Sequence, residues 1–182
     1  MNEPAASPTL RRYVLPSVNS LEGWGIFVIA SDGYFSSVSD YGNYAFRWTA
    51  IGEGRDFREF LAQIGSDYLL GKISPGRTYD GDMTEKNVLA LIQKQLEDGL
   101  IDDDDAEREK ELLRDEDHLE NVVNFHQWSE KTAIEHDVSG IYETSHPSDV
   151  VAFCEKLLPR FQAALRAELA EERDKEKFPP VK

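Results

Sequence analysis

The sequence predicts an α+β fold in which an N-terminal antiparallel meander of three or four strands packs on helices and a helical C-terminal half follows. Residues 11–51 hold short apolar runs separated by turn residues, which is typical of antiparallel strands. From residue 55 onward, apolar side chains instead recur at helical spacing. A chain of 182 residues, 40% of them hydrophobic, is also long enough to bury a core of its own.

The run Trp24–Ala30 is the predicted centre of the sheet. The side chains on both faces of this strand would be apolar. We therefore expect a strand covered on both sides, with Ile26 and Val28 in the core. Asp32-Gly33 follows, and this pair between two extended runs predicts a tight hairpin. The next strand is therefore predicted over Tyr34–Ser39.

Tyr44, Phe46 and Trp48 alternate with smaller or polar residues, which predicts a third strand with its aromatic rings on one face. Tyr13-Val14-Leu15 precedes Pro16 and predicts a fourth, edge strand, where a following proline does least harm.

Four helices are predicted after the sheet. Asp56, with Glu59 three residues later, is typical of a helix start. Pro159 should kink the last helix near Glu155 or divide it in two, because proline lacks an N–H and clashes with the preceding turn. The predicted helices cover residues 55–72, 84–98, 103–130 and 147–173, with a loop over 134–145.

We expect these elements to form a single domain over 11–176, between a flexible N-terminus at 1–10 and a flexible tail at 177–182. The N-terminal residues show no basic segment followed by an apolar one, and no apolar run approaches the ~20 residues that span a bilayer. The single Cys154 excludes an intramolecular disulfide, and a reducing cytosol fits this best.

Several blocks occur in a distinctive order along the chain: RRYVLPS, EGWGIFVIASDGYFSSVSDYGNYAFRW, DFREFL, DYLLGKISP, YDGDMT, FHQW and LPRFQAALRAEL. As an ordered set they resemble a family of uncharacterised proteins encoded by bacteriophages and prophages. The resemblance runs from Arg11 to about Glu168. It implies a phage-related origin and action in the cytoplasm of the bacterial host, and it brings no catalytic residues with it.

The net charge of −15 is concentrated in one segment. Residues 97–120 contain 13 acidic and 3 basic residues, so they account for a net −10 of it. Such a surface repels phosphates, which argues against direct nucleic-acid binding and favours a protein partner with a basic surface. The candidate partner-binding residues are Asp102, Asp103, Asp104, Asp105, Glu109 and Glu116. The alternative for the aspartates is an ordinary solvated helix start.

Two further functions are compatible with the sequence. In one, the acidic segment imitates DNA and inhibits a nucleic-acid-binding defence protein, which requires Asp102, Asp105, Glu109 and Glu116 to point outward. In the other, Trp24, Tyr44, Phe46 and Trp48 line a pocket for a small molecule or nucleotide. Core packing is the commoner role for aromatic residues on strands.

Neither a metal nor a cofactor is expected. His118 and His126 are eight residues apart, whereas helical metal-binding pairs are usually four apart, and His136 and His146 are scattered. Asp80-Gly81-Asp82 with Glu85 lacks the length of a calcium loop, and a helix cap at Asp82 or Thr84 is the simpler role. Cys154 lies on an apolar helical stripe, so we expect it to be buried and inert. No motif of a hydrolase, phosphate-binding loop or metalloprotease is present, so an enzyme is not the favoured interpretation.

Overall fold

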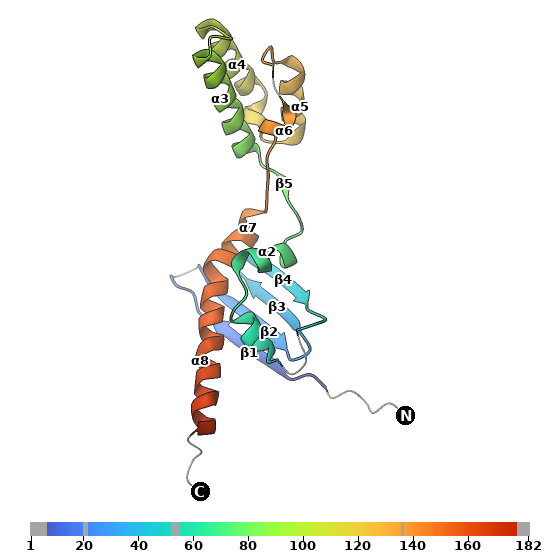
Figure 1. The fold of residues 1–182 in the computed structure, drawn as a ribbon, viewed down its shortest axis with the longest axis vertical. Coiled ribbons are helices and arrows are strands. Elements are labelled where there is room, and N and C mark those ends of the chain that lie inside the picture. The colour runs from blue at the N-terminus through green and yellow to red at the C-terminus, as the bar shows by residue number, and fades with distance from the viewer. Residues whose placement is uncertain (1–6, 20–21, 52–54, 136, 178–182) are drawn as a thin grey trace, which may run out of the picture. The chain divides into compact units, whose positions relative to one another are not determined.

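The computed structural model describes residues 7–19, 22–51, 55–135 and 137–177. These residues form two compact units (Figure 1). Unit 1 combines the two ends of the chain, Met1–Gly76 and Pro147–Lys182, and unit 2 is the intervening segment Arg77–His146. The α+β class is confirmed, because a four-stranded antiparallel sheet comes first and helices follow.

The sheet of unit 1 has the strand order β1-β2-β3-β4, which is the predicted meander with all four strands. Its strands are β1 (Leu10–Leu15), β2 (Gly25–Ala30), β3 (Tyr34–Ser39) and β4 (Gly42–Arg47). The β2–β3 hairpin turns at Gly33, whose φ of +90° is one that glycine adopts without strain. A Cβ at Gly33 would lie 2.1 Å from the carbonyl oxygen of Trp48, so the site also requires glycine sterically.

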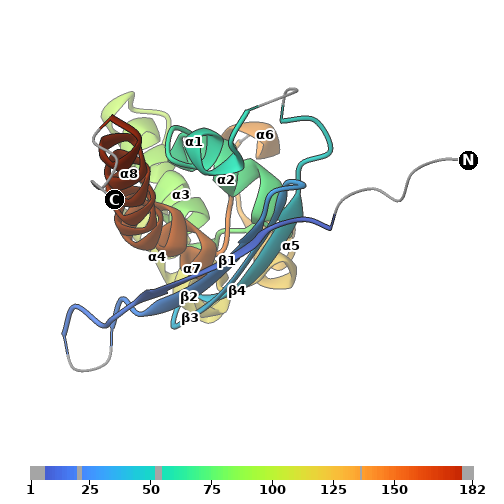
Figure 2. The same ribbon diagram turned by 90° about the horizontal axis from the view of Figure 1, so that it is seen from below.

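The expectation that β2 is covered on both sides is wrong. The helices of unit 1 lie on one side of the sheet (Figure 2), and only that side is part of the core. Phe27 and Ile29 are 0% and 2% exposed, whereas Ile26 and Val28 alternate with them and are half-buried on the other side. An apolar run marks a strand, but it does not reveal how many faces are covered.

The segment predicted as one helix over 55–72 contains two, α1 (Phe57–Leu61) and α2 (Ser66–Ile73). Asp56 caps α1 through a bond from the N–H of Arg58. The break is stabilised from another helix, because Gln162 Nε2 donates to the carbonyls of Leu61 and Ile64 at 3.0 and 2.8 Å. Partners far along the chain therefore satisfy carbonyls that a continuous helix would pair internally.

The interruption expected near Glu155 is a π-helical turn. The segment predicted over 147–173 consists of α7 (Ser148–Ala152), the π-turn η2 (Phe153–Leu157) and α8 (Leu158–Lys177). The wider turn just before Pro159 accommodates a residue that has no N–H to donate. No described helix is both long and apolar enough to cross a membrane.

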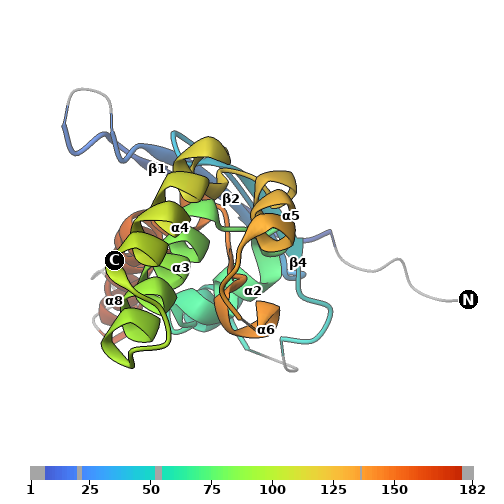
Figure 3. The same cartoon turned by 90° about the horizontal axis from the view of Figure 1, so that it is seen from above.

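Unit 2 is mainly helical (Figure 3) and begins and ends with a short antiparallel pair, β5 (Thr78–Tyr79) and β6 (Thr144–Ser145). Its helix α3 (Gly81–Glu97) begins three residues before the predicted start, because Asp80 is the cap and accepts from the N–H of Met83. The loop expected over 134–145 contains one helical turn, α6 (Val138–Ile141), and β6. The core of unit 2 is separate from that of unit 1 and is formed by Val88, Ile92, Ala106, Leu113, Leu119, Phe125, Trp128, Ile134 and Ile141.

The predicted helix over 103–130 is broken into α4 (Asp103–Asp115), the 3-10 turn η1 (Asp117–Leu119) and α5 (Val122–Lys131). Three successive residues, Asp117 to Leu119, have φ values of 48°, 53° and 57°, in the left-handed region. Acidic residues are unfavourable at the negative end of a helix, and Asn121 caps the next helix from its own side chain. The break turns Leu119 into the core, where it is 0% exposed.

The predicted flexible ends lie partly outside the described residues, which omit 1–6 and 178–182. Within the described part, Leu10 already belongs to β1 and Lys177 ends α8.

Candidate functional site

The strand registers define which residues share the side of the sheet that faces away from the helices of unit 1. Directly opposed residues of antiparallel strands project to the same side, so each set of four partners forms a row across the sheet. We call this side the outer face. Its three rows are Val14–Ile26–Val38–Asn43, Arg12–Val28–Ser36–Ala45 and Leu10–Ala30–Tyr34–Arg47.

The outer face is mostly apolar and substantially exposed. Eight of these twelve positions carry apolar or aromatic side chains, two are polar and two are arginines. Leu10, Val14, Val38 and Tyr34 are 67%, 54%, 48% and 39% exposed. The described helices of unit 1 pack only on the inner face (Figure 2), so among the described residues they leave the outer face open, although Ala30 in its third row is only 3% exposed.

The charge of the outer face is opposite in sign to that of the whole protein. Arg12 lies on β1 and Arg47 on β4, the two outermost strands, and none of the twelve positions is acidic. Arg47 pairs with Asp32 of the adjacent turn at 2.7 Å. The protein carries a net charge of −15. Among the described contacts, only Arg12 therefore leaves a positive charge on this apolar face without a carboxylate partner.

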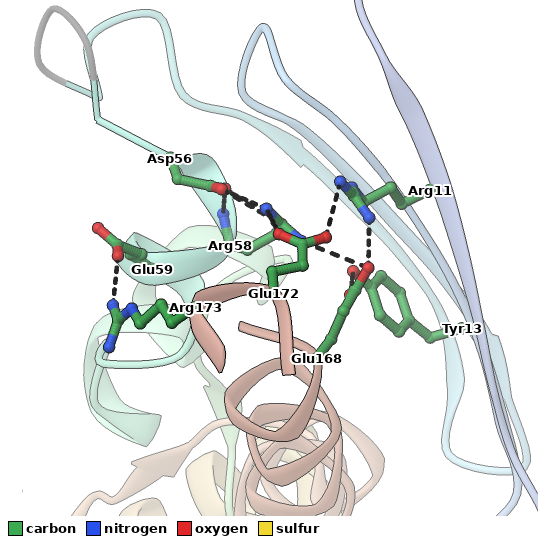
Figure 4. Close-up of polar contacts among 8 residues, drawn as sticks. All are labelled: Arg11, Tyr13, Asp56, Arg58, Glu59, Glu168, Glu172 and Arg173. Atoms are coloured by element: carbon green, nitrogen blue, oxygen red, sulfur yellow. Dashed lines mark hydrogen bonds and ion pairs between the residues drawn. The ribbon is translucent and has the colours of Figure 1, made fainter. Parts of the chain in front are cut away.

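A network of ion pairs on the inner side joins the sheet to α1 and α8 (Figure 4). Arg58 lies at its centre and is 7% exposed. Its guanidinium donates to Asp56 and, through both terminal nitrogens, to Glu172 at 2.8 and 2.7 Å. The hydrogen bonds with Glu172 and Asp56 raise the pKa of Arg58 above its ordinary value. Each of the three nitrogens of this guanidinium already donates to Asp56 or Glu172, so binding a ligand would require Arg58 to leave these partners.

Arg11 and Tyr13 of β1 complete the network. The Tyr13 hydroxyl and the Arg11 guanidinium both donate to Glu168 of α8. Burial, followed by the hydrogen bond to Glu168, raises the pKa of Tyr13 above its usual range. Tyr13 also packs edge-on against Phe161, with ring centroids 5.4 Å apart. These contacts fix α8 on the sheet, which is a structural role.

A cavity of about 420 Å³ lies beside this network. Its lining combines polar side chains with a small apolar floor: Thr9, Arg11, Ile29, Ala30, Ser31, Arg55, Asp56, Phe57 and Arg58. Two of its three arginines, Arg11 and Arg58, are already paired with carboxylates. The cavity therefore offers little unbalanced charge to a ligand.

The aromatic residues predicted to line a pocket are mainly core residues. Trp48 is 6% exposed, contacts Phe46, Phe57 and Phe60, and donates its Nε1–H to the hydroxyl of Tyr68 at 3.0 Å. Tyr44 is half-buried, packs against Phe153 with tilted rings whose centroids are 4.8 Å apart, and donates its hydroxyl hydrogen to the carbonyl of Tyr41 at 2.6 Å. Trp24 is half-buried and directly precedes β2. Core packing accounts for Tyr44, Phe46 and Trp48.

The acidic residues divide into two groups. Asp102, Asp103 and Asp104 are exposed at the start of α4, where Asp102 and Asp105 form a capping box. The expectation that Glu109 and Glu116 point outward is wrong, because they are only 7% and 5% exposed. Glu109 accepts from the Thr132 hydroxyl at 2.6 Å and the Ala133 N–H at 2.9 Å, and Glu116 pairs with Lys131.

The remaining candidates are not brought together. Among the described residues, no group of three His, Cys, Asp or Glu side chains could hold a metal ion, and His136 lies outside them. His118 contacts Glu85 at 2.8 Å, and Asp80 is occupied as a helix cap. Cys154 is buried, and burial raises the pKa of its thiol to about 11, so it is a poor nucleophile at neutral pH.

The sequence interpretation missed the outer face. Its alternation is visible in Leu10-Arg12-Val14 and in Tyr34-Ser36-Val38, but the pattern alone does not distinguish the covered side from the open one.

Comparison with known proteins places the chain in a family. Residues 6–167 match the sequence profile of a family described as a phage family. No curated protein and no solved structure gives a significant match. The match covers most of the 182 residues and includes the whole sheet and all of unit 2. The chain therefore belongs to this phage family.

Proposed function

We propose that this phage protein acts by binding a host or phage protein through the outer face of its sheet. Such binding would serve host takeover or defence against host immunity, in the cytoplasm of the infected bacterium. The observation that carries the proposal is the exposed apolar surface formed by the three outer-face rows.

The size of the surface suits a specific contact. Four strands about 4.8 Å apart and six residues long, at about 3.3 Å per residue, give the whole outer face a footprint of roughly 400 Å² in projection, and eight of its twelve positions are apolar or aromatic. Contiguous apolar patches of about 300–600 Å² on monomeric proteins are often functional. Val14 and Val38 are about half exposed. A partner that covers them would remove apolar surface from water, which is favourable for binding.

The other two functions have less support. A DNA mimic needs a rigid line of outward carboxylates, and the burial of Glu109 and Glu116 removes two of its members. A pocket lined by aromatic side chains is not supported either, since Tyr44, Phe46 and Trp48 pack on neighbouring core residues. A basic partner surface stays a prediction for Asp102, Asp103, Asp104 and Asp105.

Site-specific photo-crosslinking tests the proposal. A benzophenone amino acid replaces Ser36, at the centre of the outer face, in protein produced inside the bacterial host. We expect illumination to give one dominant protein adduct. The matched control carries the same group at exposed Gln127 of α5.

The specificity of the adduct decides the outcome. Val38→Asp, next to Ser36 on the outer face, should abolish the adduct, whereas Val123→Asp on exposed α5 should leave it unchanged. The proposal fails if Ser36 and Gln127 give the same adducts, or if Val38→Asp has no effect while circular dichroism shows a folded protein.

A further inference from the structure

We infer that two copies of this chain pair through the free edge of β4, so that their sheets join into one continuous antiparallel sheet. The inference does not rest on the proposed function, because it concerns the edge of the sheet and the proposed function concerns its outer face. It follows from the backbone groups that β4 leaves unpaired, from the residues that would face one another, and from the charge of unit 1.

β4 is one of the two outermost strands of the sheet (Figure 1). In an antiparallel sheet, the backbone groups of successive residues point alternately to one side and to the other. The N–H of Trp48, directly after β4, donates to the carbonyl of Gly33 at 3.0 Å, so the even-numbered residues of β4 face β3. The N–H and C=O groups of Asn43, Ala45 and Arg47 therefore point to the free edge. None of these backbone groups bonds to another described residue, and all three residues are exposed.

β4 lacks the features that keep sheet edges from pairing with other chains. Natural proteins protect such edges with prolines, bulges or charged side chains. The segment Gly42–Arg47 contains no proline, and its register with β3 is continuous without a bulge. Its only charged residue is Arg47, at the end of the strand. This edge is therefore open to a further strand.

The sequence of β4 is complementary to itself in one antiparallel register. When Ala45 lies opposite Ala45 of the second copy, Asn43 lies opposite Arg47 of that copy, and all the outward backbone groups find partners. On the inner side, Tyr44 then lies opposite Phe46 of the second copy, and opposed aromatic pairs stabilise a sheet. No like charges face each other in this register. The same two-fold pairing places the two outer faces side by side.

The free edge of β1 is less suited to such pairing. The N–H of Ser31 donates to the carbonyl of Thr9 at 3.0 Å, so β1 turns the backbone groups of Leu10, Arg12 and Val14 outward. A pair that uses all three residues would place Arg12 opposite Arg12 of the second copy. Directly opposed like charges are destabilising, so the observations favour β4.

The charge of unit 1 permits this contact. Its two chain segments contain 15 acidic and 13 basic residues, a net charge of −2, and the other −13 belongs to unit 2. Arg47 already pairs with Asp32 at 2.7 Å and would face the neutral Asn43 of the second copy. At physiological ionic strength, exposed charges more than about 8 Å apart are largely screened. Two nearly neutral sheet units can therefore approach each other.

Sedimentation equilibrium of the full chain at physiological salt tests the inference. We expect a monomer–dimer equilibrium at micromolar to millimolar protein. Ala45→Pro removes an N–H that has no partner in the monomer, so it should raise the dimer Kd at least about hundredfold while the sheet stays folded. The matched control, Val14→Pro, removes an outward N–H of β1 and should leave the Kd unchanged. Circular dichroism confirms that each variant is folded.

Two charged variants test the register. Ala45→Lys and Ala45→Glu each place like charges opposite one another, and each should raise the dimer Kd at least about tenfold. A mixture of the two variants should dimerise about as well as the unmodified protein, because the opposed charges then have opposite signs. Only a register centred on Ala45 predicts this rescue, and neither variant removes a backbone hydrogen bond.

Several results would overturn the inference. It fails if the full chain is monomeric at all concentrations, if folded Ala45→Pro still dimerises, or if the mixed variants dimerise no better than either one alone. A dimer that Val14→Pro dissociates would place the contact at β1, and one that only Val38→Asp dissociates would place it on the outer face. An adduct between Ser36 and a different protein tests the proposed function separately, whichever of these results is obtained.

Discussion

Arg58 and Glu172 are 114 residues apart in the sequence, yet they form a bidentate ion pair with N–O distances of 2.8 and 2.7 Å. The pair joins α1, the first helix after the sheet in the sequence, to the last turns of α8 (Figure 4). Asp56 holds the other side of the same guanidinium. One buried cation therefore connects the two separate chain segments that make up unit 1.

Replacing Arg58 by Met should destabilise the protein by about 2–3 kcal/mol. Loss of one partner of a buried ion pair costs about 3–5 kcal/mol, and the value is lower here because Glu172 and Glu168 are 40% and 29% exposed. Urea unfolding followed by circular dichroism measures the change. Arg173→Met is the matched control, since Arg173 pairs with Glu59 at the surface, and it should cost less than about 1 kcal/mol. Equal costs for both variants would contradict the central role of Arg58.

The same network predicts a loss of stability in acid. Hydrogen bonds from Arg58 lower the pKa of Asp56 and of Glu172. A carboxyl whose pKa is lower in the folded state stabilises the protein above its unfolded pKa of about 4, and this contribution disappears as the pH falls through the folded pKa. The free energy of unfolding should therefore fall below about pH 4. Arg58→Met should make this fall shallower, and urea titrations at a series of pH values measure it.

Substitutions at Phe27 and Val28 should differ greatly in how much they destabilise the protein. Phe27 is 0% exposed and contacts the rings of Phe35, Phe153 and Phe161, so Phe27→Ala should cost about 3–5 kcal/mol. Val28 projects from the outer face and is half-buried, so Val28→Thr should cost less than about 1 kcal/mol. Thermal melting of both variants measures the difference. A Val28 variant as unstable as the Phe27 variant would mean that both faces of the sheet are covered.

The sequence predicted the strands better than it predicted their surroundings. The β3 boundaries and the meander order follow from turn chemistry and alternation, which are local properties of the chain. The side of β2 that is buried depends on α8, which lies more than a hundred residues away, so Ile26 and Val28 could not be distinguished from Phe27 and Ile29 by pattern. The helix breaks at 62–65 and 117–119 likewise depend on partners elsewhere, Gln162 in one case and the core around Leu119 in the other.

Substitution of Glu109 tests whether this acidic residue is a buried structural group, unlike the exposed aspartates at the start of α4. Its carboxylate accepts two hydrogen bonds from the segment after α5, so Glu109→Ala leaves the Thr132 hydroxyl and the Ala133 N–H without that partner. We expect unit 2 to lose about 1–3 kcal/mol. Glu111→Ala removes the same charge from an exposed position of α4 and should change stability by less than about 0.5 kcal/mol. Hydrogen exchange of the α4 and α5 amides shows where stability is lost. Equal effects of the two substitutions would contradict the structural role of Glu109.

The last prediction concerns the single domain expected over residues 11–176. Unit 1 has a core of its own, and unit 2 enters and leaves through the paired strands β5 and β6, with Thr78 opposite Ser145. Opposed Cα atoms in such a pair are only about 5 Å apart, so a short Gly-Ser linker can replace residues 78–145 without stretching the chain.

We expect the shortened chain to fold and to melt in one cooperative transition. Phe27→Ala in this background should cost about the same as in the full chain, because its neighbours Phe35, Phe153 and Phe161 all belong to unit 1. Circular dichroism and calorimetry on both pairs of proteins provide the comparison. A shortened chain that is unfolded would show instead that residues 11–176 form one cooperative domain, in which the core of unit 1 depends on unit 2 for its stability.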